Sequence, residues 1–93
     1  MATSFENIAK EQIHSLKFPH TDVLDNPQAI SQRKVDLQRA LALGNLEHSK
    51  IKIFFEDNQS KKMVETTVWA VTDEQVVLKQ GAGIPINRIY FAA

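Results

Sequence analysis

Basic and aromatic side chains alternate with apolar ones in the segment KIKIFFE, residues 50–56. In a strand, side chains two residues apart share a face, so Lys50, Lys52 and Phe54 would lie together. An ammonium group neutralises a phosphate, and an aromatic ring offers a surface on which a base can stack. Lys79 and Arg88 come from later segments and could join this group, which predicts a nucleic-acid-binding surface. The alternative is a solvated lysine face that protects a sheet edge.

Large apolar residues are also concentrated near the end of the sequence, where Ile89, Tyr90 and Phe91 stand in a row. Three such side chains are hard to bury together in a small domain, and an exposed edge strand can pair with another subunit. Trp69 lies on the less apolar face of a predicted strand, where a large ring can be a stacking platform for a base or a hot spot for a partner. These four residues predict an oligomer or partner interface. The alternatives are that two of the C-terminal three complete the core and that a helix covers Trp69.

The sequence contains no pattern typical of catalysis, of a metal site or of a phosphate-binding loop. Such a loop needs Lys-Ser or Lys-Thr leading into a helix, whereas the GAG of residues 81–83 leads into Ile-Pro-Ile, so a corner with a positive φ is predicted. His14, His20 and His48 lack metal-site spacing, and no serine stands in a nucleophile-elbow setting. We therefore expect no enzyme activity, no metal and no cofactor.

The chain of 93 residues suits one domain, and its 11 basic and 11 acidic side chains give a net charge of zero. Dedicated nucleic-acid binders are usually basic, so this balance argues against one but allows a local patch. The absence of cysteine excludes disulfides and fits a reducing compartment. Because no signal-peptide pattern and no apolar run of membrane-spanning length is found, we expect a soluble, cytoplasmic protein without membrane contact.

Two helices are expected in the first half of the chain. Apolar residues recur at near-helical spacing over residues 3–16, and Thr3 with Glu6 resembles a capping box. The second helix is expected to begin with Asn26 as its cap and Pro27 in its first position, and to end at Gly44 in a left-handed conformation. Residues 1–26 are predicted to be an N-terminal extension that could hold a short helix.

After residue 44 the sequence consists of strand formers separated by turns. KIKIFFE alternates as a half-buried strand, EDNQSKK is typical of a hairpin turn, and MVETTVWAV, residues 63–71, predicts a second strand. VVLKQ predicts a third strand, and IYF a last edge strand. Short strands with tight connections favour a small, strongly bent antiparallel β-barrel. We therefore expect the α+β class, mainly β, with a helix and a small barrel in residues 27–93.

This order of elements resembles the Sm-like and SH3-like small β-barrels. The turn-rich AVTDEQVVLKQG leads from one strand to the next, and IPINRI completes the sheet. The stretch from LALGNLEHSKIKIFFED to IPINRI is also similar to a family of small uncharacterised bacterial proteins, which has no established activity. An Sm-like relationship implies ring assembly and RNA contact through strand-connecting loops. No Sm-type nucleotide-binding signature can be matched here residue by residue.

Together these observations favour a non-enzymatic binding or assembly module that self-associates as a homo-oligomer. The alternative is an Sm-like RNA-binding protein. The two differ in their response to salt, because phosphate contacts weaken steeply with salt and apolar association does not.

Overall fold

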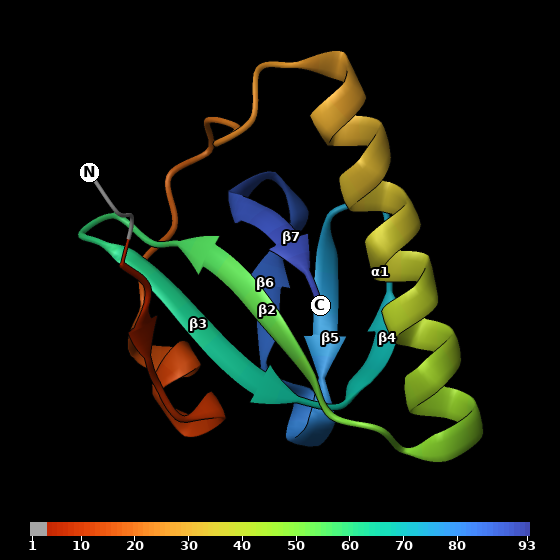
Figure 1. Cartoon of the computed structure of the whole chain (residues 1–93). Coiled ribbons are helices and arrows are strands. Elements are labelled where there is room, and N and C mark those ends of the chain that lie inside the picture. The colour runs from red at the N-terminus through yellow and green to blue at the C-terminus, as the bar shows by residue number, and fades with distance from the viewer. Residues whose placement is uncertain (1–3) are drawn as a thin grey trace.

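The computed structural model describes residues 4–93, which contain one α-helix and seven strands in two sheets (Figure 1). The helix, α1, spans Pro27–Glu47. The strands are β1 (Glu6–Asn7), β2 (Ile51–Glu56), β3 (Lys61–Thr66), β4 (Val68–Val71), β5 (Gln75–Leu78), β6 (Gly83–Pro85) and β7 (Ile89–Ala92). Three short 3₁₀ segments lie between them, at Lys10–Ser15, Lys79–Gly81 and Ile86–Arg88. The predicted α+β class is confirmed.

The strands form one sheet in the order β1–β3–β2–β7 and a second in the order β4–β5–β6. β3 and β4 are separated by Thr67 alone, so the chain passes from one sheet to the other at this residue. The prediction of one unbroken strand over residues 63–71 is therefore wrong, because the chain must bend sharply to reach the second sheet. No closed barrel is found among residues 4–93. The barrel stays a prediction.

Helix α1 begins where the sequence predicts. The side-chain oxygen of Asn26 accepts hydrogen bonds from the backbone N–H groups of Gln28 (2.7 Å) and Ala29 (3.3 Å). Pro27 follows in the first turn, where its missing N–H is not needed. The helix packs against β4 and β7 along one side of the sheets (Figure 1). Neither α1 nor any other helix in residues 4–93 has the length and apolar character needed to cross a membrane.

The predicted end of this helix at Gly44 is wrong. The helix continues to Glu47, and His48 takes the left-handed conformation, with φ of 54°. Gly44 instead lies where α1 approaches β4 most closely, since a Cβ atom there would stand 2.3 Å from the carbonyl oxygen of Val68. The glycine is therefore needed for close packing between helix and strand rather than for ending the helix.

The N-terminal segment does not form the predicted α-helix. Glu6 and Asn7 pair in parallel with β3, and the N–H of Ile8 donates to the carbonyl of Met63 at 2.9 Å. A 3₁₀ segment follows, which buries Ile13. Glu6 therefore belongs to a strand rather than to the predicted capping box, whose Thr3 lies outside the described residues. This N-terminal segment pairs with the free edge of β3 instead of forming a helix.

The hydrophobic core lies between the two sheets and is closed by α1 and the N-terminal segment. In β2 the alternation is as predicted, since Ile53 and Phe55 are fully buried while Lys52 is exposed. The core also includes fully buried side chains from β3, β4, β5, β6 and β7, namely Val64, Val68, Val76, Leu78, Ile84 and Ile89.

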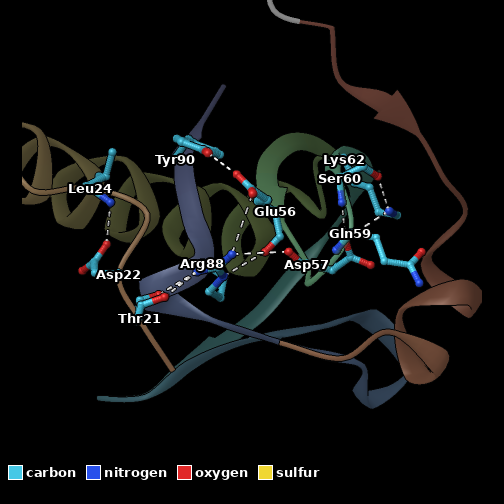
Figure 2. Close-up of polar contacts among 10 residues, drawn as sticks. All are labelled: Thr21, Asp22, Leu24, Glu56, Asp57, Gln59, Ser60, Lys62, Arg88 and Tyr90. Atoms are coloured by element: carbon cyan, nitrogen blue, oxygen red, sulfur yellow. Dashed lines mark hydrogen bonds and ion pairs between the residues drawn. The ribbon is translucent and has the colours of Figure 1, made fainter. Parts of the chain in front are cut away.

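Two buried arginines join the N-terminal segment to the rest of the fold. Arg33 of α1 donates to both carboxylate oxygens of Asp22 at 2.9 Å and to the carbonyl oxygen of Ile89 at 3.0 Å. These hydrogen bonds from Arg33 hold the pKa of Asp22 below its ordinary value. Arg88 donates to backbone carbonyl groups of two separate segments, those of Thr21, Glu56 and Asp57 (Figure 2). A buried charge must be paired or hydrogen-bonded, so we infer that both arginines have a structural role.

The glycines of residues 81–83 form a corner between β5 and β6. Gly81 has a φ of 89°, and Gln80 before it has a φ of 71°. Strand β6 follows directly. The predicted corner with a positive φ is confirmed.

Candidate functional site

Four aromatic side chains form one continuous group on the outer side of the β1–β3–β2–β7 sheet. Phe54 of β2 stacks on Phe91 of β7, with ring centroids 4.5 Å apart and planes inclined by 21°. Phe5, just before β1, packs edge-on against Phe54 at 5.1 Å and Tyr90 at 5.8 Å. We call these four residues, Phe5, Phe54, Tyr90 and Phe91, the aromatic face.

A β-bulge places two consecutive residues of β7 on the aromatic face. Phe54 pairs with Phe91, but the next residue, Phe55, pairs with Ile89, so Tyr90 is the extra residue. Ile89 is fully buried, whereas Tyr90 contacts Phe5 on the outer side. Strict alternation would have put Ile89 and Phe91 on one side, and the sequence prediction missed the bulge. Ile89 therefore belongs to the core and is not accessible to a partner.

Charged side chains of both signs surround the aromatic face. The ammonium group of Lys61 lies 5.4 Å from the centroid of the Tyr90 ring, and the Tyr90 hydroxyl donates to the Glu56 carboxylate (Figure 2). Across the strands, Lys52 is the register partner of Glu65, and Glu56 that of Lys61. Opposite charges in such pairs stabilise a sheet. The border of the aromatic face is therefore charged but electrically balanced.

Tyr90 is expected to ionise at an unusually high pH. Partial burial, together with the hydrogen bond to Glu56 and its negative charge, raises the pKa of Tyr90 from 10.0 to about 12. Because the folded pKa is raised, this contribution to stability is present below pH 10 and is lost as the pH rises toward 12. Tyr90 is the only tyrosine, so the ultraviolet absorbance of tyrosinate reports its titration directly.

Replacing Glu56 with glutamine should move the pKa of Tyr90 back toward its ordinary value, because the neighbouring negative charge is removed. Glu65→Gln is the matched control, since Glu65 lies on the same sheet and is not the partner of the Tyr90 hydroxyl. A wild-type midpoint near the ordinary value, or equal shifts in both variants, would contradict the contact.

The aromatic face is open to solvent and borders a groove. Phe91 is 41% exposed, and the other three rings are half-buried. A groove of about 450 Å³ runs between this face and α1. It is lined by Phe5, Leu24, Ala29, Gln32, Arg33, Asp36, Lys61, Tyr90 and Phe91.

The structure does not bring together the five residues predicted to bind nucleic acid. Lys52 and Phe54 share the outer side of β2, but Lys52 stands opposite a glutamate. Lys50 is exposed just before this strand, whereas Lys79 follows β5 in the other sheet. Arg88 is only 6% exposed, and its guanidinium donates to carbonyl groups inside the fold. Arg88 is therefore not available to a phosphate.

Trp69 and Lys79 come together at a second place, near the bend between β3 and β4. Trp69 is 51% exposed, so α1 does not cover it. It lies at an irregularity in the pairing of β4 with β5, between Val68 and Ala70, and Lys79 follows the end of β5. A hollow of about 410 Å³ opens here, which we call the corner hollow. Its lining residues are Gly44, Asn45, His48, Thr67, Trp69 and Lys79.

The one buried carboxylate of the β2–β3 turn is held by hydrogen bonds. Burial by itself raises the pKa of Asp57, but hydrogen bonds from the N–H groups of Ser60 and Gln59 and from Lys62 outweigh it, so the pKa is lowered (Figure 2). Asp57 therefore orders the turn and is not suited to accept a proton at neutral pH. Among residues 4–93, no group of three or more His, Asp or Glu side chains is placed to hold a metal ion.

Comparisons with known proteins give no relative for this chain. No family model matches it, and neither a curated protein nor a solved structure matches it. The resemblance to small Sm-like and SH3-like barrels is therefore not supported by a family match.

Proposed function

We propose that the protein is a non-enzymatic binding module that self-associates through the aromatic face. The observation that carries this proposal is the stacked Phe54–Phe91 pair at the edge of the sheet, with Phe91 41% exposed. Exposed aromatic clusters bordered by polar side chains mark sites of protein association. Phe5 and Tyr90 extend the cluster, so an approaching partner meets several rings held in place by one another.

A second copy of this chain is the partner that the charges favour. The border of the face carries Lys52 and Lys61 as well as Glu56 and Glu65. In a twofold pair each subunit presents the same surface, so a border with both signs can place lysines of one copy against glutamates of the other. The net charge of zero means that two copies do not repel each other as a whole.

We further propose that the two sheets act as one small barrel of the Sm-like or SH3-like kind. Two features support this. Strand β2, which follows α1, pairs with β7, the last strand in the chain. The bend at Thr67 joins β3 of one sheet directly to β4 of the other. Such a barrel would hold the aromatic face on a rigid support.

The alternative, an Sm-like RNA-binding protein acting through the predicted basic group, has weaker support. Arg88 is buried, Lys52 stands opposite Glu65, and Lys79 follows the end of β5 in the other sheet. At the border of the aromatic face, Lys61 is the register partner of Glu56, and the carboxylates there would repel a nucleic-acid backbone.

Sedimentation velocity over a protein range from about 1 µM to 1 mM tests the proposal. We expect the average sedimentation coefficient to rise from the value of a monomer toward that of a dimer. Because apolar burial drives the association, raising the salt from about 50 to 500 mM should change it little. A monomer over the whole concentration range would contradict self-association. Association that disappears at the higher salt would contradict the aromatic face as its cause.

A further inference from the structure

We propose that the corner hollow binds a nucleotide, with the base stacked on the indole of Trp69 and the phosphate on the ammonium group of Lys79. This site is separate from the aromatic face, because its residues come from the end of α1, the bend at Thr67 and the β4–β5 pair. The proposal therefore does not depend on self-association.

The indole of Trp69 offers the stacking surface. Trp69 is 51% exposed, and the residues around it in the hollow are largely polar. The irregular pairing between Val68 and Ala70 sets this side chain at the outer side of a short strand that is otherwise well paired. Every nucleobase presents a flat π-face, so an exposed indole can stack a base of any kind.

The charges of the corner hollow favour an anion, although the protein as a whole is neutral. The lining contains one lysine and no carboxylate; Glu47, next to His48, accepts a hydrogen bond from the hydroxyl of Ser49 at 3.4 Å. Lys50 adds a further positive charge nearby, since it directly precedes Ile51, whose register partner is Thr66, the residue before the bend. Lys50, just before β2, and Lys79, just after β5, thus lie near the bend at Thr67.

The C-terminal end of α1 limits where in the corner hollow the phosphate can bind. The C-terminal end of α1 carries a partial negative charge, which disfavours an anion. Part of this charge is neutralised, because the carbonyl of Gly44 accepts a hydrogen bond from the N–H of His48 and the carbonyl of Leu43 accepts one from the N–H of Ser49. The phosphate should therefore bind on the Lys79 side, and the base edge should face Asn45 and His48, whose side chains can donate and accept hydrogen bonds.

The single tryptophan of the chain makes the test direct, since stacking quenches its fluorescence. Adenosine and uridine monophosphate are titrated as free nucleotides, and an oligouridylate of about eight residues as a single strand. N-acetyltryptophanamide, titrated in parallel, corrects for light absorbed by the nucleotides. Saturable quenching by a free nucleotide or by the oligouridylate supports the site. Equal affinity for both identifies a free nucleotide as the ligand, and tighter binding of the oligonucleotide identifies a single strand.

Two variants decide whether the quenching comes from the corner hollow. Lys79→Glu should weaken binding about tenfold, because it removes a charge-assisted hydrogen bond to the phosphate. Lys34→Glu makes the same charge change on the exposed side of α1, outside the hollow, and should leave binding unchanged. Trp69→Ala, followed by the anisotropy of a labelled oligonucleotide, should weaken binding by about 5-fold to 150-fold.

Salt gives an independent measure of the phosphate contacts. With two lysines engaged, oligonucleotide affinity should fall about sevenfold between about 50 and 200 mM salt. If neither the free nucleotides nor the oligouridylate quench the fluorescence saturably, the proposal is overturned. Equal weakening by Lys79→Glu and Lys34→Glu would also overturn it. A sedimentation experiment that finds no self-association would leave this result unaffected, so the two proposals fail separately.

Discussion

Replacing Gly44 with alanine is expected to destabilise the protein by about 1–3 kcal/mol, and replacing it with valine by more. The added Cβ atom would stand 2.3 Å from the carbonyl oxygen of Val68 and 3.3 Å from Cγ2 of Thr67. The nearer contact is with backbone that belongs to β4, so it cannot be relieved by turning one side chain. Helix α1 must instead move away from the sheet against which it packs. The expected change is net of the gain of about 1 kcal/mol that alanine normally brings to a helix interior.

Urea unfolding followed by the fluorescence of Trp69 measures this change in the free energy of unfolding. Asn45→Ala is the matched control, because Asn45 is the next residue of the same helix turn and is exposed. It should leave the free energy of unfolding unchanged or raise it slightly through helix propensity. Equal stability of the Gly44→Ala variant and the wild type would show that helix and strand are not in close contact at this position.

Replacing Phe91 with glutamate is expected to weaken self-association by about 30-fold or more, the effect of removing a central aromatic anchor from an interface. Phe91 stacks on Phe54 and is the most exposed ring of the aromatic face. A carboxylate in its place would have to lose its water when a second copy covers this face, which is costly for an unpaired charge. Sedimentation velocity on the wild type and the variant gives the two dimerisation constants.

Val35→Glu provides the control for this substitution. Val35 is an apolar residue of α1 that is 51% exposed and lies outside the aromatic face, so the same charge is introduced at another accessible position. It should leave the dimerisation constant unchanged. Phe91→Ser, which removes the ring without adding a charge, should also weaken association if the ring is the anchor. If all three variants associate like the wild type, the aromatic face is not the interface.

Those parts of the fold that local patterns determine were predictable from the sequence. Asn26 and Pro27 mark the start of α1, because a cap and a first-turn proline act on their own neighbours in the chain. The alternation in KIKIFFE gave the correct inward side of β2, since burying one face of a sheet fixes its register. The corner at Gly81 followed from the conformational freedom of glycine.

Features that depend on distant contacts were not predictable in this way. In the sequence Gly44 resembles the glycine that ends a helix. It is instead needed for close packing against Val68, which is far away in the sequence. The segment around Ile8 has helical spacing, yet the free edge of β3 pairs with it. The break between β3 and β4 at Thr67 cannot be recognised in a run of β-branched residues, because its position depends on the path of the whole sheet.

The same distinction applies to the candidate site. The sequence predicts Tyr90, Phe91 and Trp69 as interface residues, because large rings near a strand edge or on a polar face are recognisable by type. It could not show that the bulge at Tyr90 turns this ring outward beside Phe91 and leaves Ile89 inside. Arg88 was assigned to a phosphate by its charge alone, and the backbone carbonyl groups that surround it come from two other segments.

The most direct test of self-association through the aromatic face is a dilution series of ¹H–¹⁵N correlation spectra. Association places a second copy over specific amides, so their chemical shifts change with protein concentration. The proposal predicts changes confined to Phe5, Phe54, Tyr90, Phe91 and the residues next to them, with no change at Val35 or around Trp69. Spectra that do not change with concentration, or changes that cluster on the exposed side of α1, would contradict it.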